Sequence, residues 1–174
     1  AKTLAIVNVV GSTIANIADH TLYTWAGPEI AVATTKGYTT QVSVLYLFAL
    51  YAAEKMNRID EELYKRLLES LNTLPKKIQE ALDMNSAIPT LAKKYHGADS
   101  MFFIGRNTDY AVALEGALKM KEISYIHAES YAAGELKHGT IALIEEHQPV
   151  IALCCNEKKK KKTMSNIVEV KARG

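Results

Sequence analysis

The run SMFFIGRNTDYAVALEGALKMKEIS, residues 100–124, decides the fold class of this chain. Its first six residues are almost wholly apolar, which is typical of a strand that is buried on both faces of a parallel sheet. A glycine turn and a helix follow directly, so the run has the strand–turn–helix order of α/β proteins. We therefore predict an α/β fold with doubly wound parallel sheets, in which functional residues gather at the carboxyl ends of the strands.

Three further short runs predict strands of the same kind: residues 3–10, 20–26 and 148–155. The first of them opens the chain, although a parallel strand needs neighbours that crossover helices connect to it. We therefore expect an incomplete piece of two domains. Residues 1–57 would be the C-terminal half of the first domain, 58–98 a helical connector, and 99–174 the N-terminal part of the second.

Helices account for much of the remaining sequence. Residues 35–56 predict one long helix, because apolar side chains recur there with i, i+3 and i+4 spacing. Residues 57–98 have a charged, helical pattern with an interruption at Pro75. Five consecutive lysines occupy residues 158–162. Because clustered cations oppose the dipole at a helix start, we expect these lysines to lie in a solvated or locally disordered loop.

The composition excludes several classes of function. With 174 residues, 48% of them hydrophobic, the chain can build a core, and its net charge of +2 implies no polyanionic partner. The basic residues are not interleaved with aromatic ones, so we expect no nucleic acid. The apolar run 42–53 is too short and too rich in tyrosine to span a bilayer. Cys154 and Cys155 are adjacent and cannot easily form a bridge, so we expect reduced core residues in a cytoplasmic protein.

The predicted helix of the run 100–124 carries a stripe of three charged residues. Glu115, Lys119 and Glu122 are spaced i, i+4 and i+7, which places them within about 60° of one another on one side of the helix. Bulky apolar residues border the stripe on both sides: Val112, Leu114, Leu118 and Ile123. Such borders favour a partly buried polar wall whose carboxylates act as acids or bases. An ion-pair ladder on an exposed face is the alternative, and spacing alone does not decide between them.

A short turn lies further along the chain. Gly134 and Gly139 bracket a single helical turn that ends at His138. Histidine titrates near neutrality, so His138 is suited to hand a proton to a substrate oxygen. A histidine that interacts with the dipole at a helix end is the alternative interpretation. We also expect the turn to need support from outside itself, because it is too short for anchoring by its own packing.

Two longer blocks of sequence resemble one known family. They are LEGALKMKEISYIHAESYAAGELKHG, residues 114–139, and AGPEIAVATTKGYTTQ, residues 26–41. Both are similar to the isomerase region of the glutamine:fructose-6-phosphate amidotransferases, which is built from sugar isomerase (SIS) domains. The similarity covers nearly the whole chain, and two blocks in this order are more specific than any short motif. The resemblance implies flavodoxin-like SIS domains and, for the parent protein, an aminotransferase that is also a ketose–aldose isomerase.

The resemblance further implies the reaction and the residues that carry it. Fructose 6-phosphate would be aminated and isomerised to glucosamine 6-phosphate, with ammonia supplied from glutamine. Glu122 would move the proton between C1 and C2, a task suited to a desolvated carboxylate. Lys119 would tune that carboxylate and assist proton transfer at the sugar hydroxyls, and Glu115 would orient its partners. His138 would open the sugar ring, and in the family it comes from the neighbouring subunit, which implies a homodimer with a composite active site.

The resemblance also assigns substrate binding to Val32 and Thr34, which would line the sugar-phosphate site through the backbone and a hydroxyl. It implies no cofactor and no metal, because this proton transfer does not require one and the histidines and carboxylates lack closed ligand spacing. Thr140 stands where the family has proline after His-Gly, a departure that would loosen the loop holding His138. The family's phosphate-binding loops are missing, so we expect the piece alone to be inactive.

Two other interpretations stay open. Another SIS protein that responds to a sugar phosphate, such as a regulator or a deglycase, would share the fold without needing the stripe and the histidine together. A module that only assembles subunits would catalyse nothing. A DNA-binding region upstream in the parent would favour the regulator, whereas a glutaminase domain would favour the amidotransferase.

Overall fold

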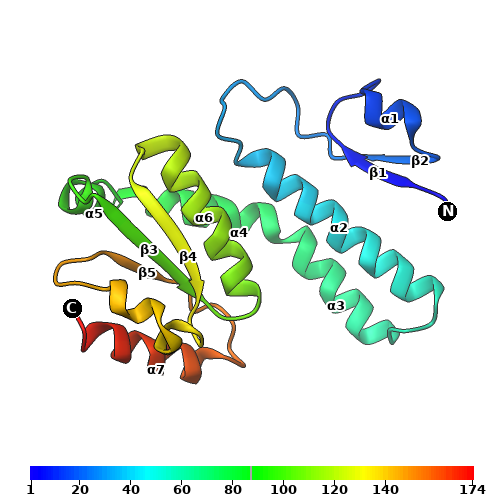
Figure 1. Cartoon of the computed structure of the whole chain (residues 1–174). Coiled ribbons are helices and arrows are strands. Elements are labelled where there is room, and N and C mark those ends of the chain that lie inside the picture. Colours follow the sequence, from blue (N-terminus) through cyan, green and yellow to red (C-terminus); the bar gives the residue numbers. More distant parts are fainter. Residues whose placement is uncertain (87) are drawn as a thin grey trace. The chain divides into compact units, whose positions relative to one another are not determined.

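The structure is a computed structural model that describes residues 1–86 and 88–174. The chain forms two compact units, Ala1–Ser86 and Ala87–Gly174, which we call unit 1 and unit 2 (Figure 1). Each unit combines a parallel sheet with helices, so the predicted α/β class is confirmed. The division of the chain into two partial domains, residues 1–57 and 99–174, and a helical connector, residues 58–98, stays a prediction.

Unit 1 begins with a strand–helix–strand crossover. Strands β1 (Leu4–Val7) and β2 (His20–Tyr23) pair in parallel, and helix α1 (Thr13–Ile17) connects them. Ser12 caps that helix, since its side-chain oxygen accepts a hydrogen bond from the backbone N–H of Ala15. Both predicted strands of this unit are therefore confirmed in a shorter form.

Three helices and a 3₁₀ turn follow in unit 1: α2 (Lys36–Lys55), α3 (Glu61–Asn72), α4 (Leu74–Asp83) and η1 (Met84–Ser86). Helix α2 matches the long helix predicted over residues 35–56. Pro75 lies in the first turn of α4, where proline is tolerated, so the predicted interruption is the boundary between α3 and α4. Within the described part of this unit, Ala5 and Leu50 are the only buried apolar residues, so its core is small.

Unit 2 is built on three parallel strands in the order β4–β3–β5, with β3 in the centre (Figure 1). The strands are β3 (Ser100–Gly105), β4 (His127–Ala132) and β5 (Val150–Ala152). The helices and 3₁₀ turns are α5 (Ile88–Tyr95), α6 (Thr108–Ser124), η2 (Leu136–His138), η3 (Thr140–Leu143) and α7 (Lys160–Lys171). The run 100–124 forms β3 and α6, as predicted.

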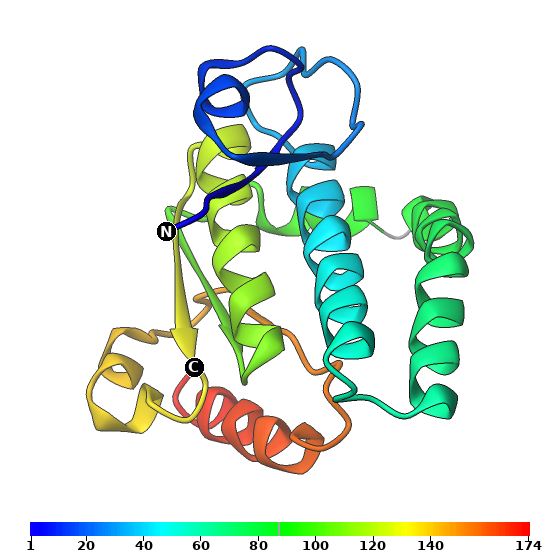
Figure 2. The same ribbon diagram turned by 90° about the vertical axis from the view of Figure 1, so that its right-hand side faces the viewer.

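The side chains of β3 alternate between the two faces of the sheet, and each face has its own core. Phe102 and Ile104 point to one face, where they pack with residues of the η2–η3 segment and α7: Ala133, Leu136, Ile144 and Val170. Met101 and Phe103 point to the other face, where they pack with residues of α6 and β4: Ala113, Ala117 and Ala128. Helix α6 and turn η2 therefore lie on opposite faces of the sheet (Figure 1, Figure 2).

Three features of unit 2 differ from expectation. No strand is predicted over β4, because its sequence HAESYA is largely polar. Helix α7 begins at Lys160, so the lysine run lies only partly in a loop, and all of its lysines except the half-buried Lys159 are exposed. The buried Thr163, Asn166 and Val170 stabilise this helix against the unfavourable dipole interaction. The prediction that Cys154 and Cys155 are core residues is wrong, because β5 ends before them, Cys154 is only half-buried and Cys155 is exposed.

Candidate active site

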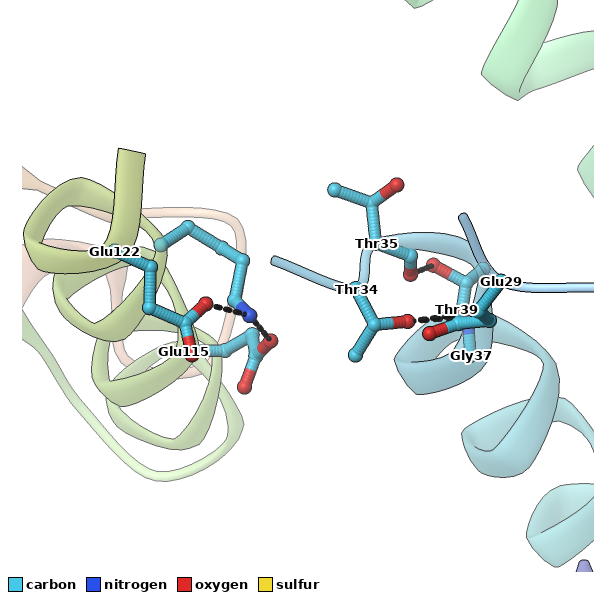
Figure 3. Close-up of polar contacts among 8 residues, drawn as sticks. Glu29, Thr34, Thr35, Gly37, Thr39, Glu115 and Glu122 are labelled. Carbon is cyan, nitrogen blue, oxygen red and sulfur yellow. Dashed lines mark hydrogen bonds and ion pairs between the residues drawn. The ribbon is translucent and has the colours of Figure 1, made fainter. Parts of the chain in front are cut away.

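Helix α6 brings three charged side chains together. The Nζ of Lys119 lies 3.5 Å from Oε1 of Glu115 and donates a hydrogen bond to Oε2 of Glu122. Figure 3 shows the two carboxylates converging on this ammonium group. The side chains of Lys119, Glu115 and Glu122 are 16%, 22% and 31% exposed. The stripe is therefore partly buried, which favours a polar wall over a freely solvated ion-pair ladder.

The charge of Lys119 is stabilised by its two neighbours. The hydrogen bond with Glu122 raises the pKa of Lys119, partial burial opposes this shift, and the charges of Glu122 and Glu115 add to it. A lysine with a raised pKa is fully protonated at neutral pH. The stripe therefore presents one permanent cation between two carboxylates, and the ammonium group holds both carboxylates in place on one side of the helix. The apolar residues that border the stripe are all exposed: Val112, Leu114, Leu118 and Ile123.

Small residues hold α6 close to the sheet. Ala113 and Ala117 are buried in the core next to β3. Gly116 lies so near Phe103 that a Cβ atom added to it would stand 3.0 Å from the ring. At 100° per residue this small-residue face lies roughly opposite the charged stripe on the helix. The stripe therefore points away from the sheet while the helix beneath it is fixed by close packing.

Asp109, in the first turn of α6, ties the helix to the end of β5. Its carboxylate is buried, and Oδ2 accepts hydrogen bonds from the backbone N–H groups of Cys155 and Asn156, each at 3.0 Å. This contact joins the carboxyl ends of two neighbouring strands through one side chain. No feature of the sequence points to it, because an aspartate in a first helical turn is also the ordinary complement to the helix dipole.

His138 ends turn η2 and is exposed. Leu136 of the same turn is 1% exposed and packs in one core with Ile104 and Val170. The turn therefore gains support from outside itself, because its one deeply buried leucine packs against β3 and α7. Since η2 and α6 lie on opposite faces, the sheet separates His138 from the stripe of the same chain.

Arg106 supports the loop that leads to this turn. Its Nε donates a hydrogen bond to Oδ1 of Asn166 at 3.0 Å, and Asn166 is buried on α7. The guanidinium group also lies against Gly134, where an added Cβ atom would stand 2.8 Å from one of its nitrogens. Arg106 thus connects the end of β3 with α7 and with the loop before His138.

The predicted substrate-binding residues lie in unit 1, in the loop between β2 and α2. Val32 is 98% exposed. The Thr34 hydroxyl donates a hydrogen bond to Oε1 of Glu29, and the backbone N–H of Gly37 donates to the same oxygen at 3.0 Å (Figure 3). Glu29 and Gly37 are not identified as candidate residues from the sequence, because their contact depends on how the loop folds back and not on a regular spacing.

In residues 1–86 and 88–174, no three histidine, cysteine or carboxylate side chains gather closely enough to hold a metal ion. No helix there combines the length and the apolar character that crossing a membrane requires.

Known proteins resemble this chain over its whole length. The glutamine–fructose-6-phosphate aminotransferase (isomerizing) of Clostridium tetani is 53% identical over 174 residues, and the protein of the same name from Symbiobacterium thermophilum is 54% identical over 174 residues. Each alignment covers 100% of this chain and 29% of the relative. The chain thus spans about 29% of the length of the curated relatives it matches.

This chain is also similar to a solved structure and to a family model. The C-terminal domain of glucosamine-fructose-6-phosphate aminotransferase from Francisella tularensis matches with a TM-score of 0.95 and 39% identity, over 98% of this chain and 48% of that chain. The model of the SIS domain family matches residues 1–51 and 94–174. Together with the parallel sheets of both units, this match shows that the chain belongs to the SIS domain family.

Proposed function

We propose that this chain is part of the isomerase region of a glutamine–fructose-6-phosphate aminotransferase. The full-length enzyme would convert fructose 6-phosphate to glucosamine 6-phosphate with ammonia derived from glutamine. The observation that carries the proposal is the Lys119 ammonium held between the carboxylates of Glu115 and Glu122 on α6. The identity of about half of all residues with relatives of that name supports it.

The isomerisation needs a base that takes a proton from C1 of the sugar and returns it at C2. Glu122 is suited to this role, because its side chain is the more accessible of the two carboxylates in the stripe. Lys119 would tune the Glu122 carboxylate and assist proton transfer at the sugar hydroxyls. Glu115 would hold the lysine from the other side and so keep its ammonium group in place.

The enzyme would be a homodimer with a composite active site. His138 would open the sugar ring by proton transfer at the ring oxygen. The sheet of unit 2 lies between this histidine and the stripe of its own chain, whereas the exposed side chain of His138 is accessible to a second subunit. This separation favours a site in which α6 of one subunit meets His138 of the other.

Val32 and Thr34 would contact the sugar phosphate. Both lie in the loop before α2, where Val32 is exposed and Thr34 is half-buried. The enzyme would work in the cytoplasm, since free cysteines persist in a reducing compartment. We expect no nucleic acid partner, because the net charge of the chain is only +2.

Replacing Glu122 by glutamine in the full-length enzyme tests the assignment of the base. The amide keeps the shape of the side chain but cannot accept the proton, so the rate of synthesis should fall by more than about a hundredfold. The affinity for fructose 6-phosphate should stay within about tenfold of the wild-type value, because the shape of the site is preserved.

Glu61→Gln is the matched control for this experiment. Glu61 forms an i, i+4 ion pair with Lys65 on α3, as Glu115 does with Lys119, but both side chains of that pair are largely exposed. Its loss should leave the rate of synthesis unchanged. A Glu122→Gln enzyme that keeps more than about a tenth of the wild-type rate would show that Glu122 is not the base.

A further inference from the structure

The loop between β2 and α2 is tied to the rest of unit 1 by polar contacts. The Oδ1 of Asn8 accepts hydrogen bonds from Oγ1 of Thr24 at 3.1 Å and from the backbone N–H of Ala26 at 2.9 Å. The Nδ2 of the same side chain donates to the carbonyl oxygen of Gly27 at 2.7 Å. Since one amide makes all three contacts, Asn8 fixes the first part of the loop.

The second part of the loop closes around Glu29. The Oε1 of this residue accepts hydrogen bonds from the Thr34 hydroxyl and from the Gly37 N–H (Figure 3). A Cβ atom on Gly37 would stand 2.7 Å from Oε1 of Glu29 and 2.6 Å from Oγ1 of Thr34. Only glycine therefore lets the three residues meet without displacement. Thr35, the N-cap residue of α2, makes no side-chain cap, so Glu29 satisfies a backbone N–H at this helix end instead.

This contact determines which way the Thr34 hydroxyl points. A carboxylate accepts hydrogen bonds, so the single hydroxyl proton of Thr34 is directed at Glu29. The Oγ1 oxygen keeps two lone pairs, one of which the Gly37 N–H approaches at 3.2 Å. Thr34 can therefore accept a hydrogen bond from a ligand but has no proton left to donate. A sugar hydroxyl meets that requirement, whereas an ionised phosphate oxygen needs a donor.

We propose that Glu29 is a positioning residue that fixes the Thr34 hydroxyl as an acceptor for a hydroxyl group of the sugar. The inference rests on the proposed function, in which Thr34 binds the substrate. Glu29 would not touch the substrate and would act only through Thr34. Its loss should therefore weaken the binding of fructose 6-phosphate and leave the chemical step nearly unchanged.

Steady-state kinetics of the full-length enzyme test this role. Glu29→Ala should raise the KM for fructose 6-phosphate about tenfold while kcat stays within about twofold. Glu29→Gln keeps an acceptor oxygen and should bring the KM back to within about threefold of wild type. In a Thr34→Val background, which lacks the hydroxyl, Glu29→Ala should raise the KM no further.

Asp60→Ala is the matched control, because Oδ1 of Asp60, the N-cap residue of α3, also accepts a backbone N–H at a helix start, that of Leu63 at 2.7 Å. It should lower the melting temperature as Glu29→Ala does, yet leave the KM unchanged. A wild-type KM in Glu29→Ala, or equal rises in KM with and without the Thr34 hydroxyl, would overturn the role of Glu29. In that case the proposed function would still stand if the wild-type enzyme makes glucosamine 6-phosphate. If the wild-type enzyme does not make it, both the proposed function and the role of Glu29 would be overturned.

Discussion

Helices α6 and α2 support the two groups of candidate site residues, and they are stabilised in different ways. Helix α6 buries Ala113 and Ala117 in a core formed with β3 and β4. Helix α2 has 20 residues, of which Leu50 alone is buried in the described structure. Five of its large apolar side chains are exposed: Leu45, Tyr46, Leu47, Phe48 and Tyr51. The charged stripe thus rests on a packed core, whereas the loop before α2 is held by the hydrogen bonds of Asn8 and Glu29.

The stability of each group of candidate residues therefore depends on a different kind of contact. A packed core is sensitive to changes of side-chain volume, because a cavity or an overlap cannot be relieved by solvent. A network of hydrogen bonds at an exposed loop is sensitive to the loss of a donor or acceptor and tolerates small changes of volume. We therefore expect unit 2 to respond mainly to changes of size and unit 1 to changes of polarity.

The largest difference is expected when one apolar side chain is truncated in each unit. Ile104 is fully buried, so Ile104→Ala should lower the free energy of unfolding by ~2–5 kcal/mol. Leu45 on α2 is exposed, and Leu45→Ala should cost less than ~1 kcal/mol. Urea denaturation followed by circular dichroism measures both. Equal losses would show that α2 is packed as tightly as the sheet of unit 2.

A second pair of variants adds one methyl group to each unit. Gly116→Ala places a Cβ atom against the buried Phe103 ring and should destabilise the protein by ~1–2 kcal/mol, even after the gain in helix propensity. Gly37→Ala meets the flexible side chains of Thr34 and Glu29, so its effect on stability should stay within ~0.5 kcal/mol. The KM for fructose 6-phosphate should rise in Gly37→Ala alone. The opposite ranking of stabilities would contradict the comparison.

The pH dependence of stability should also differ between the two units, and unit 2 should contribute at alkaline pH. Tyr131 of β4 donates a hydrogen bond to Glu129, and this contact together with burial raises the pKa of Tyr131 to about 12. Between pH 10 and pH 12 the unfolded chain loses this phenolic proton while the folded chain keeps it, so stability falls as the pH rises. Tyr131→Phe should remove that part of the slope, an effect near ~1 kcal/mol because the side chain is only partly buried.

Unit 1 should contribute to the pH dependence of stability at acid pH, through Asp19. Hydrogen bonds from the backbone and the hydroxyl of Thr3 hold the pKa of Asp19 below its usual value. The corresponding stability is present above the unfolded pKa of 3.8 and is lost as the pH falls through the lower folded value. Asp19→Asn should flatten the acid limb of a stability curve and leave the alkaline limb unchanged. Chemical denaturation from pH 2 to pH 12 would record both limbs, and an altered alkaline limb in Asp19→Asn would contradict this assignment.

The smallest expected effect concerns Ser130 of β4. Its Oγ is buried without a hydrogen-bond partner in the described structure, so the folded state gains nothing from this hydroxyl. Ser130→Ala should leave the free energy of unfolding unchanged or raise it by up to ~1 kcal/mol. A loss of more than ~1 kcal/mol in urea denaturation would show that the hydroxyl is bonded after all.

Local sequence pattern predicts the central elements of the fold. The apolar run 100–105 and the apolar periodicity of residues 35–56 depend on neighbours in sequence, and both elements appear nearly at the predicted bounds. Strand β4 escapes prediction because it lies at the sheet edge, where His127 and Glu129 are accessible to solvent and break the apolar signal.

The spacing of Glu115, Lys119 and Glu122 predicts that these side chains meet, because a helix fixes such contacts locally. Contacts between distant residues could not be predicted in this way. Leu136 anchors the His138 turn only because β3 and α7 lie beneath it, and Glu29 meets Gly37 only after the loop folds back. The sequence therefore predicts the charged stripe but not the contacts that support the His138 turn or the loop before α2.

The composite site is tested most directly by mixing two inactive variants of the full-length enzyme, His138→Ala and Glu122→Gln. If His138 acts on the α6 stripe of the neighbouring subunit, each mixed dimer contains one intact site. Random exchange makes half of the dimers mixed, so about a quarter of the wild-type activity should return. If subunit exchange is demonstrated by tagged purification and no activity returns, His138 does not complete a site in the neighbouring subunit.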